Sequence, residues 1–209
     1  MVELLVVIGI IAILAGVALG PITSGIKKAQ QSSGVQTSRT IALSEFTYSN
    51  DNNQTWPLSS SGSASTAADP VKVLLAGNYI SDPSIFYIGG SKETKYTGTT
   101  ASTSITQQNI SFDFWAQSST QAYNANVPDQ APVITSSFGT GVQVTPSIGA
   151  SGYSAPVQAS NPYGTAGIAV CYKSNSAKFV QAATSGNVAP IIDPTIPSGT
   201  SLITLPGGG

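Results

Sequence analysis

The residue types that most often carry out chemistry are scarce in this chain of 209 residues. Histidine is absent, which removes the commonest general base and the commonest metal ligand. Cys171 is the single cysteine, which excludes an intrachain disulfide and any multi-cysteine metal or haem site, and we expect it to be buried like a small hydrophobe. Serine is abundant, but no G-x-S-x-G motif accompanies it. The sequence therefore predicts that the protein is not an enzyme and holds no cofactor.

Acidic side chains offer another kind of chemistry, because carboxylates in loops can hold calcium. Asp113 with Asp129, and Asp82 with Glu93, are candidate pairs. Their spacing is generic, so we expect these acids to be solvated turn residues and predict no metal site.

Glu3 is the acid with the most specific surroundings, because uninterrupted apolar residues follow it from Leu4 to Leu19. A charge at the centre of a bilayer costs on the order of 2.5–3.5 kcal/mol, and less near the end of a segment. Glu3 therefore either pairs with a charge on another molecule or sits at the membrane surface without a pairing role.

The apolar run that positions Glu3 is about 24 Å long as a helix, at roughly 1.5 Å per residue. A bilayer span needs about 20 apolar residues, so this run is slightly short. Apolar residues cover every face of it, and the rest of the chain, rich in Ser, Thr, Asn, Gln and Gly, is too polar to wrap it. We expect lipid or other protein to surround it. A signal peptide fits less well, since its first residues should be basic, whereas Lys27 and Lys28 follow the run.

Gly16, Gly20 and Pro21 interrupt the end of the apolar run. Proline lacks the N–H group that would bond the carbonyl of Val17, so we predict a kink or a locally unwound stretch around residues 14–22. One interpretation is a chance kink in a membrane helix; the other is a joint that lets helices pack in a fibre, where neighbours satisfy the freed backbone groups. Small residues would also allow helices to approach closely; they are Gly9, Ala12, Ala15 and the Gly16–Gly20 pair.

A second helical stretch is predicted from about residue 22 to residue 49, followed by turn-forming residues 50–53. Its apolar face needs a sheet to cover it. That face comprises Ile22, Ile26, Ala29, Val35, Ala42, Leu43 and Phe46, while Lys27, Lys28, Gln31, Arg39 and Glu45 take polar positions.

The rest of the chain predicts a β-rich head. We expect an α+β fold in which a long N-terminal helix, its apolar half kinked near Pro21 and its other half amphipathic, packs on a small antiparallel sheet. The division is residues 1–50, with 1–21 as the polymerisation or membrane segment, and a globular head of 51–209 with long polar loops. Patterns of alternation and turn residues give a short helix at 71–76, an apolar strand ending at residue 88, strands at 110–115, 132–137, 141–145 and 201–205, and a hairpin of 167–172 with 177–181.

Asn53 and Asn109 begin N-x-S/T patterns and are possible glycosylation sites. Ser/Thr-rich stretches at 59–66 and 97–106 offer O-glycosylation instead. The alternative is that these are unmodified polar loops.

The opening residues Val2-Glu3-Leu4-Leu5-Val6-Val7-Ile8-Gly9-Ile10-Ile11-Ala12-Ile13-Leu14-Ala15 resemble the start of mature type IV pilins and type II secretion pseudopilins. The match consists of an acid, two leucines, a β-branched run, then Ala and Gly, and later Pro21. It covers about the first 25 residues strongly. The rest resembles more weakly a group of bacterial pilin-like proteins, at Tyr79 to Phe86 and at Gly167 to Gln181.

The resemblance implies a leader peptide that a membrane prepilin peptidase clips at a glycine, and methylation of the new N-terminus. It also implies that the subunit waits in the inner membrane until an ATPase-driven machinery pulls it into a helical filament. The partner of Glu3 would then be the amino terminus of a neighbouring subunit. The family's acid is usually the fifth mature residue and Glu3 is the third here, so either two residues are missing before it or Met1 is not the true start.

Three functions follow as alternatives. The first is a structural subunit of a type IV pilus-like surface filament that serves adhesion, motility or a related function. The second is a type II secretion pseudopilin, and the third is a membrane-anchored surface protein that never polymerises. The expected partners are copies of the chain itself, the pilus assembly machinery and the membrane before assembly. With 8% charged residues and a net charge of −1, no specific nucleic-acid site is expected.

Overall fold

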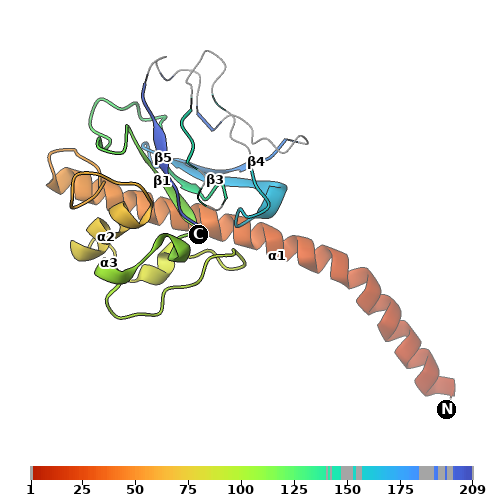
Figure 1. Cartoon of the computed structure of the whole chain (residues 1–209). Helices are drawn as coiled ribbons and strands as arrows, with labels where there is room; N and C mark the ends of the chain where they lie inside the picture. Colours follow the sequence, from red (N-terminus) through yellow and green to blue (C-terminus); the bar gives the residue numbers. More distant parts are fainter. Residues whose placement is uncertain are drawn as a thin grey trace.

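One long helix dominates the computed structural model, which describes residues 2–139, 141, 143–146, 153, 157–183, 191–192, 196 and 200–208. This helix, α1 (Val2–Asp51), runs through the head at its C-terminal end and protrudes from it at its N-terminal end (Figure 1). The shorter helical elements are α2 (Ala68–Ala76), η1 (Pro83–Phe86), α3 (Ala101–Ser104), η2 (Gln107–Asn109) and η3 (Gly164–Ala166).

The head is built on an antiparallel sheet. In the described part of the chain the sheet has five strands in the order β4-β3-β2-β1-β5, so the last strand along the chain pairs with the first. The strands are β1 (Phe112–Ala116), β2 (Pro132–Ser136), β3 (Gly167–Tyr172), β4 (Ala177–Gln181) and β5 (Ile203–Leu205). The predicted α+β fold, a long N-terminal helix packed on a small antiparallel sheet, is confirmed.

The core lies on both faces of the central strands, because β1, β2 and β3 are buried along their whole length. Successive strand residues point to opposite faces. Accordingly Phe114 packs against Phe86 with ring centroids 6.3 Å apart, and the next residue, Trp115, packs against Phe138 at 6.1 Å. Helix α1 contacts β2, β3 and β4, and in the view of Figure 1 the α2–α3 segment lies on the opposite side of α1 from the sheet.

Local patterns predicted several elements well. The β3–β4 hairpin occupies the predicted residues, and Asn175 takes the left-handed conformation that its tight turn requires, with φ of 59°. The strand predicted to end at residue 88 is wrong, because Pro83 begins the 3-10 turn η1 and Asp82 caps it by accepting the N–H of Ser84. The described residues of the predicted strand 141–145 form no strand.

Candidate assembly surface

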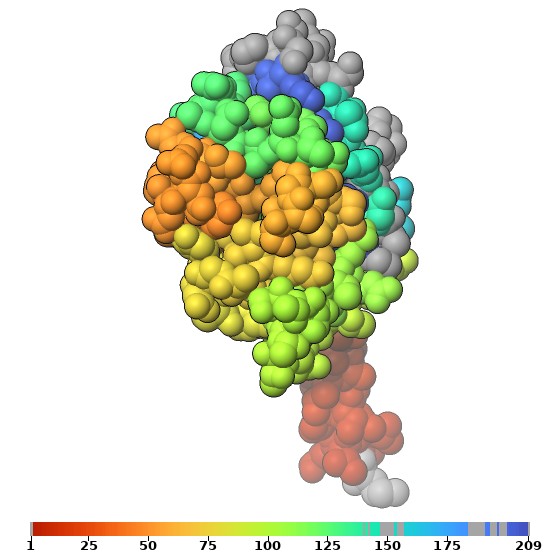
Figure 2. Space-filling model, turned by 60° about the vertical axis from the view of Figure 1, so that its left-hand side comes forward, coloured from red at the N-terminus to blue at the C-terminus, as the bar shows by residue number. Residues whose placement is uncertain are grey.

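The N-terminal half of α1 is a bare apolar surface. Figure 2 shows it projecting from the head with nothing packed against it, and every described residue from Val2 to Gln30 is exposed. The large apolar side chains on it are between 52% and 75% exposed. They are Val2, Leu4, Leu5, Val6, Val7, Ile8, Ile10, Ile11, Ile13, Leu14, Val17, Leu19, Ile22 and Ile26. Exposed apolar surface on this scale marks an interaction site, and burying these side chains would contribute on the order of 20 kcal/mol.

Helix α1 is long and apolar enough to cross a membrane, by length and composition, and none of its most apolar stretch is buried in the molecule. Glu3 lies in the first turn, exposed, and is the one charged residue before Lys27. The apolar surface therefore has a single carboxylate, Glu3, near one end and two basic residues, Lys27 and Lys28, at the other. Met1, and with it the question of N-terminal methylation, lies outside the described residues.

Pro21 sits inside α1 without unwinding it, since the helix is continuous from Val2 to Asp51. The protruding part curves gently (Figure 1), so the expectation of a bend is met by curvature and the unwound alternative is wrong. The hydroxyl of Thr23 donates to the carbonyl oxygens of Leu19, at 3.1 Å, and Gly20, at 2.9 Å. These bonds support the backbone of the turn in which the proline has removed one N–H donor.

Packing within the single chain does not require glycine at positions 16 and 20, because a Cβ atom built on Gly16 or Gly20 would meet nothing within 4 Å. With 3.6 residues per turn, Gly9, Ala12, Gly16 and Gly20 share one face of α1. On this face a second helix can approach closely. The structure thus brings Gly16 and Gly20 onto one surface, whereas Glu3 lies more than three turns away along the same helix.

The face of α1 that packs against the head differs from the predicted one. Leu43 and Phe46 remain 52% and 48% exposed, and Ile22 and Ile26 lie outside the head. Serines, among them Ser38 and Ser49, take part in the interface in place of these apolar residues. Their burial is tolerated because each hydroxyl donates a hydrogen bond to a carbonyl of α1 itself and needs no partner in the head. The buried residues of α1 are Gly34, Ser38, Ile41, Ala42, Glu45 and Ser49.

Glu45 is the main error of the sequence prediction, which placed it among the polar positions of the helix and not in its buried face. Glu45 is only 3% exposed. Burial is the main cause that raises the pKa values of the neighbouring Tyr123 hydroxyl and Cys171 thiol, and the Glu45 carboxyl raises both further. Oε2 of Glu45 has no hydrogen-bond partner. Burial therefore raises the pKa of this carboxyl well above its ordinary value.

Two further acids are buried rather than solvated, which corrects the prediction for Asp113 and Glu93. Asp113 is fully buried and accepts the backbone N–H groups of Phe138, at 2.9 Å, and Gly207, at 2.7 Å. Burial raises its pKa to about 7. Glu93 accepts the hydroxyl of Ser111 at 3.2 Å. Among the described residues, no group of three or more acidic or cysteine side chains could hold a metal ion.

The remaining candidates differ in accessibility. Asn53 lies exposed in the turn after α1. Asn109 is half-buried, and its amide is engaged, donating to the carbonyl of Thr94 at 3.0 Å and accepting the backbone N–H of Thr106 at 3.1 Å. Cys171 is buried as predicted, and burial raises its pKa to about 12.

Comparisons of the chain with protein-family models, curated proteins and solved structures gave no match.

Proposed function

We propose that this protein is a structural subunit of a type IV pilus-like surface filament, held in the membrane by α1 before assembly and by copies of α1 afterwards. The observation that carries the proposal is the bare apolar half of α1, which continues without a break into the part of the helix that packs in the folded head. A single copy of the chain leaves this half in water. A bundle of identical helices buries it, and so does a bilayer during the stage before assembly.

The geometry supports a polymer in a second way. The glycine face of α1 serves no packing purpose in the monomer, whereas in a bundle it lets helix axes come close. Under the proposal, the Glu3 carboxylate pairs with the amino terminus of a neighbouring copy, so that only one axial offset between subunits satisfies the charge. The head, with its neutral and polar surface, would then coat the fibre and serve adhesion, motility or a related function.

Electron microscopy of material sheared from the surface of cells that express the chain tests the proposal. We expect long fibres labelled by antibodies to the head, and fewer fibres from the Glu3→Ala and Glu3→Gln variants. Retention in the periplasm would favour a secretion pseudopilin, and a membrane-bound monomer would favour an anchored surface protein. Either result contradicts the surface filament. Normal fibre yield from both Glu3 variants would remove the pairing role alone.

A further inference from the structure

A polar hollow lies beside α1 at the neck of the molecule, where the helix leaves the head (Figure 1). Its volume is about 400 Å³, within the roughly 300–1,000 Å³ of small-molecule sites. One wall is α1, with Lys27, Gln30 and Gln31, and the other is the segment from Pro162 to Ala166, which contains η3. We call this the neck hollow.

The wall opposite α1 is held in place by contacts of its own. The side chain of Asn161 accepts the backbone N–H of Tyr163 at 2.8 Å and donates to the carbonyl of Ser137 at 2.6 Å. Tyr163 in turn reaches α1, because a Cβ atom added to Gly34 would overlap its hydroxyl. Thr165 therefore lies on a wall that is fixed against the helix before any ligand binds.

The polar side chains that line the neck hollow are free to bind a ligand. Lys27 and Thr165 are exposed. Within the described part of the chain, the side chains of Lys27, Gln30, Gln31 and Thr165 form no hydrogen bond and no ion pair. No Asp or Glu of that part lines the hollow, so the positive charge of Lys27 is not neutralised.

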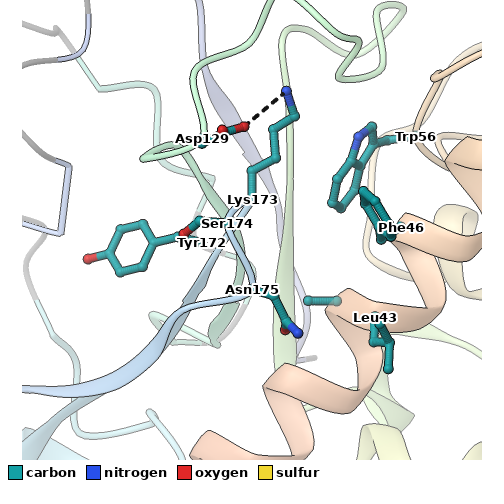
Figure 3. Close-up of a pocket in the computed structure, with 9 residues that line it drawn as sticks. Leu43, Phe46, Trp56, Asp129, Tyr172, Lys173, Ser174 and Asn175 are labelled. Carbon is teal, nitrogen blue, oxygen red and sulfur yellow. Dashed lines mark ion pairs between the residues drawn. The ribbon is translucent and has the colours of Figure 1, made fainter.

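Lys173 shows the opposite arrangement in the hollow where α1 passes the turn of the β3–β4 hairpin (Figure 3). Its ammonium group donates to the backbone carbonyls of Ala125 and Val127. It also lies 3.7 Å from Oδ1 of Asp129. A positive charge that is already paired attracts an anion weakly, so an anionic ligand favours the neck hollow.

The neck hollow lies at the depth of lipid headgroups when α1 spans a bilayer. No charged residue stands between Glu3 and Lys27, which are about 36 Å apart along a helix that rises roughly 1.5 Å per residue. The hydrocarbon core of a bilayer is about 30 Å thick, and the bilayer with its headgroups is about 40–45 Å thick. Glu3 and Lys27 therefore fall in opposite headgroup layers.

We propose that the neck hollow binds the headgroup of an anionic phospholipid, whose phosphate accepts hydrogen bonds from the Lys27 ammonium group and the Thr165 hydroxyl. The amides of Gln30 and Gln31 offer donors and acceptors to the hydroxyls of a glycerol headgroup. A choline headgroup fits less well, because it places a second positive charge beside Lys27. The inference rests on the membrane stage of the proposed function and does not require assembly.

Native mass spectrometry of the full chain in a polyoxyethylene detergent, titrated with phosphatidylglycerol or phosphatidylcholine of the same acyl chains, tests the site. We expect the monomer to bind phosphatidylglycerol about tenfold more tightly. Lys27→Gln should weaken this binding about tenfold, as the loss of one hydrogen bond to a charged group implies, and Thr165→Val should weaken it severalfold.

Lys28→Gln is the matched control, because Lys28 is exposed on the same turn of α1 and does not line the hollow. It should lose clearly less affinity than Lys27→Gln. Equal losses from the two variants would overturn the site, because the attraction would then be a diffuse effect of surface charge. Equal affinity of the parent for the two lipids would overturn it as well. So would displacement of the lipid by millimolar inorganic phosphate, which would make the ligand a free anion.

Flotation of the chain with phosphatidylcholine vesicles separates this inference from the proposed function. We expect the parent and all three variants to float, because insertion depends on the apolar half of α1. A chain that floats but shows no preference for phosphatidylglycerol would overturn the lipid site alone. A chain that does not float would overturn the membrane stage and the lipid site together. Circular dichroism of each variant confirms that the head is folded before affinities are compared.

Discussion

At the residue scale, the buried carboxyl group of Glu45 makes the stability of the head depend on pH. In the folded chain, burial raises the pKa of Glu45 well above its ordinary value of 4.5. The stability that this group contributes is therefore complete below the pKa of the unfolded chain, and it is lost as pH rises through the pKa of the folded chain. Glu45→Gln removes this titration. At alkaline pH we expect the unfolding free energy of the variant to exceed that of the parent by roughly 1–3 kcal/mol. The variant should therefore unfold at a higher temperature.

Thermal unfolding followed by circular dichroism, from pH 4 to pH 9 in detergent, measures this difference. The gap between Glu45→Gln and the parent should close toward pH 4, where both side chains are neutral. Parallel pH profiles for the two proteins would show that Glu45 does not titrate in the buried site.

Asp113 uses its buried carboxyl group to hold the C-terminal segment. Its two oxygens accept the N–H groups of Phe138 and Gly207, and Gly208 in turn donates to the carbonyl of Ile110 at 2.8 Å. Asp113→Asn replaces one acceptor with an NH2 group that faces an N–H donor. Below the folded pKa of about 7, we expect a loss of roughly 1–3 kcal/mol in unfolding free energy.

Hydrogen exchange of the amides of Thr204, Leu205, Gly207 and Gly208 should therefore be faster in Asp113→Asn than in the parent. The difference narrows as pH rises through about 7, because ionisation of the buried carboxyl then destabilises the parent as well. Unchanged protection of these amides at pH 5 would show that Asp113 does not hold the C-terminal segment.

At the element scale, α1 is held by a close approach of the head at Gly34. A Cβ atom added there would overlap the hydroxyl of Tyr163, whose ring packs edge-on against Phe179 with centroids 5.3 Å apart. We expect Gly34→Ala to destabilise the head by roughly 1–3 kcal/mol, measured by thermal unfolding. Gly25→Ala is the control, since nothing lies within 4 Å of that position. Equal stability of the two variants would show that the contact at Gly34 is loose.

The exposed glycines of α1 make a separate prediction about assembly. Gly16→Leu and Gly20→Leu should lower the yield of fibres severalfold while leaving the unfolding temperature of the head unchanged, because a bulky side chain keeps helix axes apart. Gly25→Leu lies about two and a half turns from Gly16, on the opposite face. It should assemble like the parent in quantitative electron microscopy. Equal losses from all three variants would mean that the glycine face is not an interface.

The elements that sequence predicted best are those fixed by local signals. The β3–β4 hairpin needs only its alternation and the turn at Asn175, and α1 is indicated by the apolar run before Pro21 and by the helical spacing of apolar residues after it. The rotation of α1 against the sheet was mispredicted, because buried serines such as Ser38 satisfy their own hydroxyls and act as small residues. The burial of Glu45 and Asp113 was missed for a related reason, since residues distant in sequence, Gly207 among them, supply the environment of an acid.

At the scale of the whole molecule, two parts of one chain require different surroundings. The head buries its own core and shows water a neutral polar surface, whereas the first half of α1 buries nothing. One curved, continuous helix joins the two parts (Figure 1). Under the proposal, a helical fibre would resolve this mismatch, because it would surround every copy of the apolar helix with others and leave the heads outside.

Sedimentation and electron microscopy of the purified full chain after detergent removal measure this directly. We predict fibres, with the amides of residues 2–26 protected from hydrogen exchange by neighbouring helices. A water-soluble monomer in which the same residues fold back onto their own head would contradict the filament.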